Sequence, residues 1–185
     1  MIMTQNMHFI FSGRFQPFHN DHLFILTKIL QDYPDYPIYI GILFNVIDTT
    51  IQDNEFEKLS AEHFLPERNP FTPQQRLAMV TSVAHEYGNG RLFSTLMPKP
   101  SIGSSWKLIC EMFPCGRTWI VPSCGEAWDD RKAEFFQQMG DGVKRIKFHP
   151  TTDGKQIRQA LASGDYLSVQ QSIPSPVWSV MENFL

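Results

Sequence analysis

The chain has few cysteines, no long apolar run and no clustered charge. Its three cysteines, Cys110, Cys115 and Cys124, lack the C-x-x-C spacing of a zinc site, so we expect reduced thiols and a cytoplasmic location. No segment approaches the ~18 consecutive apolar residues of a membrane span, and the N-terminus lacks a basic region and an apolar run. The net charge of −3 comes from interspersed acidic and basic residues, which excludes the basic stripe of a duplex-binding protein. We therefore expect neither a membrane nor a nucleic acid as a partner.

Short apolar runs alternate with helix-like stretches along the 185 residues. This alternation predicts a doubly wound, Rossmann-like parallel sheet with helices on both faces, an α/β fold, in one domain spanning 1–185. The irregular stretch 45–69 is unusually long for a compact domain and indicates a lid or binding loop. A C-terminal helical segment begins near 153. Strands are expected at 7–12, 38–44, 91–96, 118–121 and 143–148, and helices at 20–31, 73–86, 103–112, 129–139, 155–163 and 174–184.

The segment from Gly13 to His22 has the outline of a phosphate site. A glycine turn leaves the first strand, Arg14 supplies a permanent cation, and His19 and His22 stand three residues apart at the start of a helix. Free N–H groups and the positive end of the helix dipole attract anions there. Two histidines in this position can also be simple capping or packing residues, but the preceding Gly-Arg favours the phosphate site.

This segment reads Gly-Arg-Phe-Gln-Pro-Phe-His-Asn-Asp-His and resembles the nucleotidyltransferase superfamily with a His-x-Gly-His signature. It is most similar to the nicotinamide mononucleotide adenylyltransferases of archaeal type. Two further segments are similar to motifs of that family: 68–72, Arg-Asn-Pro-Phe-Thr, with Arg76 four residues later, and 154–158, Gly-Lys-Gln-Ile-Arg. Trp106 falls where such enzymes carry a Trp near the nicotinamide.

The resemblance implies transfer of the adenylyl group of ATP to nicotinamide mononucleotide, with Mg²⁺ bridging the ATP phosphates. In-line attack by an ionised phosphate needs positioning and charge neutralisation rather than a general base. The resemblance places His19 and His22 on the triphosphate, Arg158 on its β and γ groups, and Arg14 and Arg68 near the substrate phosphates. The expected site comprises His19, His22 and Arg158 as catalytic residues and Gly13, Arg14, Phe15, Gln16, Asp21, Arg68, Asn69, Trp106 and Lys155 as substrate-binding residues, with no metal-ligating side chain.

Several positions depart from the family, among them Asp153, which replaces a hydroxyl residue, and the segment 98–101, which offers Lys99 and Ser101 where such enzymes usually carry an Asp before the Trp. Asp21 replaces a glycine, which would place a carboxylate near the triphosphate unless the side chain turns toward solvent. Lys155 replaces a hydroxyl residue, so one hypothesis pairs Asp21 with Lys155 across the pocket. Trp106 lies in an apolar helical stretch and fits a core position as well as a stacking one.

Two alternatives to the nicotinamide mononucleotide activity remain. The same site serves a nucleotidyltransferase with another acceptor, of the cytidylyl or pantetheine-phosphate type. Asp21 favours instead a catalytically impaired nucleotide-binding homologue. The sequence leaves the oligomeric state open, a homo-oligomer included.

Overall fold

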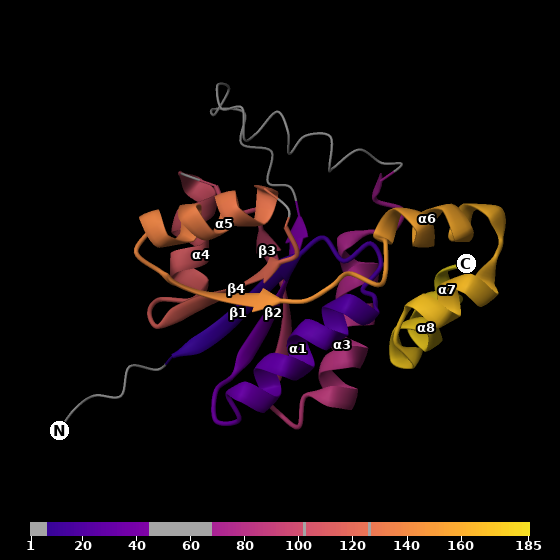
Figure 1. Ribbon diagram of the computed structural model, residues 1–185, viewed down its shortest axis with the longest axis horizontal. Helices are drawn as coiled ribbons and strands as arrows, with labels where there is room; N and C mark the ends of the chain where they lie inside the picture. The colour runs from indigo at the N-terminus through magenta and orange to yellow at the C-terminus, as the bar shows by residue number, and fades with distance from the viewer. Residues whose placement is uncertain (1–6, 45–67, 102, 126) are drawn as a thin grey trace.

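The computed structural model describes residues 7–44, 68–101, 103–125 and 127–185. Its centre is a five-stranded, all-parallel sheet in the order β3-β2-β1-β4-β5 (Figure 1). The expected doubly wound α/β fold is confirmed. The strands are β1 (His8–Gly13), β2 (Ile38–Phe44), β3 (Leu92–Pro98), β4 (Arg117–Ser123) and β5 (Gly142–Lys147).

The strand order places a topological switch at β1. From this central strand the chain proceeds outward through β2 and β3 on one side, and then returns to the other side of β1 to form β4 and β5. β1 pairs with both β2 and β4 in parallel register, for example Phe9 with Ile38 and with Thr118. In sheets of this kind ligands bind beyond the carboxyl ends of the strands at the switch point.

Each face of the sheet carries its own hydrophobic core, because successive strand residues point to opposite faces. On one face Phe9 and Phe11 of β1 pack with buried residues of α1, α3 and α8. On the other face Ile10 packs with Trp119, Phe136 and other residues of α4, α5 and β4. Figure 1 shows α1 and α3 on one side of the sheet and α4 and α5 on the other.

The helices agree with the predicted ranges to within about two residues, apart from one short helix. α7, seven residues long, was not predicted and lies between the two expected C-terminal helices. The elements are α1 (Asn20–Asp32), α3 (Pro73–Tyr87), α4 (Ser104–Met112), α5 (Ala127–Gln138), α6 (Gly154–Ser163), α7 (Tyr166–Ser172), α8 (Ser175–Met181) and the 3-10 turn η3 (Glu182–Phe184).

Most of the predicted 45–69 loop lies outside the described residues, and its role as a lid stays a prediction. Among the helices of the described ranges, none combines the length and apolar character that a bilayer crossing requires.

Candidate active site

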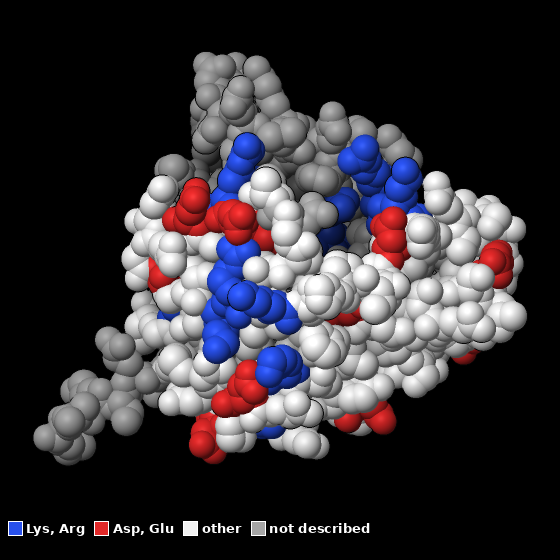
Figure 2. All heavy atoms as spheres, in the orientation of Figure 1, with Lys and Arg blue, Asp and Glu red and all other residues white. Residues whose placement is uncertain are grey.

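A cavity of about 450 Å³ opens at the carboxyl ends of β1, β2 and β4. This is the switch point of the sheet, where the fold predicts ligand binding. Figure 2 shows Lys and Arg side chains gathered in and beside a hollow on this side of the molecule. The residues that line the cavity are 11–17, His19, His22, Leu43, Lys99, Pro122, Trp128, Lys132, 153–155 and Arg158.

The turn after β1 is anchored by Gln16. Its buried side-chain amide donates to the carbonyl of Phe71 (2.8 Å) and accepts from the N–H of Phe71 (3.1 Å). The paired bonds attach the turn to the segment that leads into α3. Thr72 and Gln75 then form a reciprocal capping box with Pro73 in the first turn of α3. The side chain of Gln16 thus supports the cavity wall.

Arg76 of α3 holds two strand ends together from behind the cavity. It is 5% exposed, and its Nη1 donates to the carbonyls of Arg14 (2.6 Å) and Leu43 (2.8 Å). Burial, with a smaller contribution from Arg14, lowers the pKa of Arg76 to about 10. The guanidinium therefore fixes the exits of β1 and β2, and with them the wall of the cavity.

His19 and His22 lie against each other at the start of α1. Their ring centroids are 3.6 Å apart, and Nδ1 of His22 accepts a hydrogen bond from the backbone N–H of His19 (3.1 Å). A neutral His22 ring in this arrangement carries its proton on Nε2 and is a donor there. Nδ1 of His19 is buried without a hydrogen-bond partner among the described residues.

Both histidines are neutral at physiological pH. Burial lowers the pKa of His19 to about 4, with a smaller lowering from Arg158 that Asp21 and Asp153 oppose. Burial lowers the pKa of His22 well below its usual value, and His19 and Lys132 add to the effect. A neutral imidazole still donates one hydrogen bond, so the pair can bind an anion without carrying charge.

Cationic side chains approach the cavity from several elements: Arg14 after β1, Lys99 after β3, Lys132 on α5, and Lys155 and Arg158 on α6. Burial lowers the pKa of Arg14 to about 10, and the charges of Arg158 and then Arg68 contribute. Burial also lowers the pKa of Arg158, against the opposing effect of Asp153. Positive charges are therefore crowded around one cavity, and a bound polyanion would neutralise them.

The N-terminus of α6 faces the same cavity. Asp153 is its N-cap and accepts from the N–H of Lys155 (2.8 Å). Nη1 of Arg158 donates to the carbonyl of Gln16 (3.1 Å), so the late arginine reaches the turn after β1. The start of α1 and the start of α6 therefore approach the cavity together, and each contributes free N–H groups.

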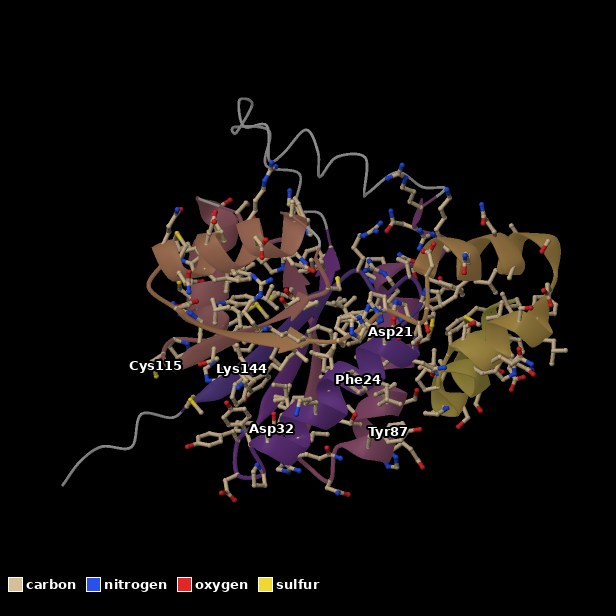
Figure 3. The ribbon with its side chains drawn as sticks, viewed as in Figure 1. Asp21, Phe24, Asp32, Tyr87, Cys115 and Lys144 are labelled. Atoms are coloured by element: carbon tan, nitrogen blue, oxygen red, sulfur yellow. The ribbon has the colours of Figure 1, made fainter. Side chains whose placement is uncertain are left out.

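The structure corrects the hypothesis for Asp21. Its carboxylate does not line the cavity and forms no ion pair with Lys155 among the described residues. It accepts instead from the backbone N–H groups of Thr151 and Thr152 (both 3.0 Å) and from the hydroxyl of Thr151 (2.7 Å). Figure 3 shows Asp21 at the start of α1, beside the chain that runs from β5 to α6. The carboxylate of Asp21 therefore does not line the cavity, although its charge acts on His19, which does.

The structure brings most of the expected residues together, but not all. Gly13, Arg14, Phe15, Gln16, His19, His22, Lys155 and Arg158 line the cavity, whereas Asp21, Arg68, Asn69 and Trp106 do not. Arg68 lies near enough for its charge to act on Arg14 and Arg158. Trp106 is 8% exposed and packs in the second core with Trp119 and Phe136.

The lining residues outside the expected site include two cations and an indole ring: Lys99, Lys132 and Trp128. Nζ of Lys132 lies 5.8 Å from the ring centroid of Trp128 and 3.7 Å from Oδ1 of Asp129. Lys99 directly follows β3, and Trp128 and Lys132 lie in the first half of α5, the helix after β4; position beyond the carboxyl end of a strand was the available signal.

The described residues hold no group of three or more His, Cys, Asp or Glu side chains suited to a metal ion. Asp153 is the one carboxylate among the lining residues described.

Comparisons with known proteins point to one group of enzymes. No family model matches the chain. Over 99 residues, 52% of this chain, it is 29% identical to a nicotinamide-nucleotide adenylyltransferase of Thermococcus sibiricus, and the match spans 44% of that enzyme. The comparisons confirm the resemblance to mononucleotide adenylyltransferases.

Solved structures of such adenylyltransferases share the fold. A Plasmodium falciparum nicotinic acid mononucleotide adenylyltransferase complexed with NaAD matches with a TM-score of 0.58 and 12% identity, covering 95% of this chain and 94% of that one. A bifunctional NMN adenylyltransferase/ADP ribose pyrophosphatase of Francisella tularensis, complexed with AMP and a manganese ion, matches with a TM-score of 0.57 and 17% identity. That match covers 85% of this chain and 42% of the other.

Proposed function

We propose that this protein transfers the adenylyl group of ATP to nicotinamide mononucleotide, with release of NAD and pyrophosphate. The observation that carries the proposal is the convergence of two helix starts, a neutral histidine pair and five Lys or Arg side chains on one cavity at the switch point. The similarity to the Thermococcus enzyme supports nicotinamide mononucleotide as the acceptor.

The reaction requires the acceptor phosphate to attack the α-phosphorus of ATP in line. That phosphate is already ionised at neutral pH, so no protein group has to remove a proton. The low pKa values of His19 and His22 agree with this, because both rings act here as neutral donors. Rate acceleration then comes from alignment of the two phosphates and from stabilisation of charge in the transition state.

We propose the following roles for residues in and beside the cavity. His19 and His22 donate to the triphosphate at the start of α1. Arg158 approaches the β and γ groups from α6, and Arg14 and Arg68 balance the charge of the reacting phosphates. Guanidinium groups suit this role since they bind two oxygens at once and remain charged.

Mg²⁺ is proposed to enter bound to ATP, since phosphate oxygens and water satisfy its preference for hard ligands. The manganese ion in the Francisella structure supports a divalent ion at such a site. Nicotinic acid mononucleotide is the second acceptor to test, because the Plasmodium structure contains NaAD and because Lys99, in this cavity, offers a cation to a carboxylate.

The alternative of a catalytically impaired homologue loses its main support. It rested on a carboxylate at position 21 facing the triphosphate, whereas Asp21 is hydrogen-bonded to the Thr151–Thr152 segment. A nucleotidyltransferase of the cytidylyl or pantetheine-phosphate type remains an alternative, which a panel of substrates tests.

The test is a product assay. The protein is incubated with MgATP and, in separate reactions, nicotinamide mononucleotide, nicotinic acid mononucleotide and pantetheine phosphate, with CTP replacing ATP in a further series. We expect NAD and pyrophosphate in equal amounts from the first reaction. Faster turnover with another pair, or none with any, would contradict the proposal.

Loss of one preorganised donor typically lowers the rate by about 10²–10³-fold, so His19→Ala should reduce kcat by that factor with the fold retained. His149→Ala, at an exposed histidine outside the cavity, is the matched control and should leave kcat unchanged. Equal turnover by the His19→Ala protein and the wild type would refute the role of the pair.

A further inference from the structure

Asp21 connects the starts of the two helices that face the cavity. It is the second residue of α1, it is 6% exposed, and its three hydrogen bonds all go to Thr151 and Thr152. Those threonines directly precede Asp153, the N-cap of α6. One buried carboxylate therefore holds the start of α6 against the start of α1.

The segment that Asp21 holds has no regular structure of its own. Residues 148–152 belong to neither helix nor strand, so their amides depend on other acceptors. Two of these amides share Oδ2 of Asp21, and the Thr151 hydroxyl uses Oδ1. The charge of the acceptor strengthens all three bonds.

This segment leads into α6, whose first residues form part of the cavity wall. Lys155 and Arg158 lie within the first turns of α6 and line the cavity, and Arg158 reaches Gln16 from there. Displacement of the start of α6 would move both cations and the free N–H groups of the helix relative to His19 and His22. A shift of about 1 Å at such a site is enough to reduce its efficiency substantially.

We propose that Asp21 is a positioning residue: it fixes the start of α6 so that the phosphate-binding groups of α1 and α6 face each other before a ligand arrives. The proposal rests on the proposed function insofar as the ligand is a polyphosphate. It assigns Asp21 no contact with the substrate. The residue acts by accepting these three hydrogen bonds, which its charge strengthens, and not by attracting or repelling the ligand.

Two substitutions separate geometry from charge. Asp21→Ala removes all three acceptor bonds. Asp21→Asn can keep the pattern, because the amide oxygen accepts both backbone N–H groups while the amide nitrogen donates to the hydroxyl oxygen of Thr151. Asp21→Gly, which restores the residue of the similar enzymes, should behave like Asp21→Ala.

The primary measurement is calorimetric binding of inorganic triphosphate and of ATP, which requires no turnover. Loss of hydrogen bonds to a charged, buried acceptor predicts a dissociation constant raised at least about tenfold for Asp21→Ala and Asp21→Gly. Asp21→Asn should stay within about threefold of the wild type, since its geometry is preserved. In steady-state assays the KM for ATP should rise with the dissociation constant, whereas the KM for nicotinamide mononucleotide should change by less than about twofold.

Asp165→Ala is the matched control. Asp165 caps α7 through Ser168, lies outside the cavity and is fully exposed, so its loss should leave triphosphate binding unchanged. Should Asp21→Ala fail to fold, Thr151→Val removes the hydroxyl bond alone and should weaken triphosphate binding about threefold.

Wild-type affinity in the Asp21→Ala protein, or in the Thr151→Val protein where that variant replaces it, would overturn the proposal. Equal losses in Asp21→Asn and Asp21→Ala would also overturn it, because charge would then be the cause. Tight triphosphate binding by the wild type without formation of NAD would contradict the proposed function and leave this inference standing. A wild type that binds neither triphosphate nor ATP would overturn both.

Discussion

The neutral histidine pair predicts that the protein loses stability in mild acid. The pKa of His19 is lowered from 6.5 to about 4, chiefly by burial. Between these two pH values the imidazole is protonated in the unfolded chain but neutral in the folded protein. Stability is full above about pH 6.5 and falls as the pH drops toward 4. His19 alone costs about 2 kcal/mol at pH 5 and about 3 kcal/mol below pH 4. His22 adds to the loss in the same direction, since burial also lowers its pKa.

The assay is urea denaturation at pH 8, 6.5 and 5 on the wild type and on His19→Gln, which keeps a polar side chain without a titrating group. The free energy of unfolding should fall between pH 8 and 5 by about 2 kcal/mol more in the wild type than in the variant. His149→Gln is the control at an exposed site and should retain the wild-type slope. Parallel pH profiles for the wild type and His19→Gln would refute the neutral pair.

Three further substitutions test the supports around the cavity, each by urea denaturation. Arg76→Met leaves two partly buried carbonyls without their donor and should lower the free energy of unfolding by about 2–4 kcal/mol. Gln16→Leu breaks both bonds to the Phe71 backbone and should lower it by about 1–3 kcal/mol. Asp141→Ala removes the acceptor of Trp119 and a buried ion-pair partner far from the cavity, so stability should fall by about 3–5 kcal/mol while ATP binding by the folded fraction is retained.

Most of the fold could be predicted because the spacing of apolar residues and the residue types at the helix ends indicate the same elements. The apolar runs of β1, β2 and β4 are typical of buried parallel strands, whereas β5 contains Lys144, Arg145 and Lys147 and is buried only in part. Thr72 and Pro73 are typical residues for the start of a helix such as α3. The helix α7 escaped prediction because it has seven residues, mostly polar, and follows the Gly164 C-cap almost at once. Its signal, a capping Asp165 with Ser168, resembles a turn in sequence.

Spacing along the chain was enough to predict which residues lie close together at the start of a helix. It was not enough to predict what the other faces of that helix contact. His19 and His22 are three residues apart and lie side by side. Asp21 precedes His22 by one residue, which turns its side chain by about 100° to another face of α1. Only the tertiary structure shows that this face meets Thr151 and Thr152. Trp106 shows the same limit, because its helix presents it to the second core.

The cations that line the cavity also lower the stability of the protein. Five Lys or Arg side chains and one carboxylate line the described wall, and burial with neighbouring cations lowers the pKa of Arg14 to about 10. Such crowding costs free energy in the ligand-free protein, as strained or repulsive groups at functional sites generally do. On the proposed function, a bound polyphosphate would neutralise these charges, and part of its affinity would come from removal of their repulsion. The charges that repel one another at this end of the sheet are therefore the ones expected to attract a triphosphate.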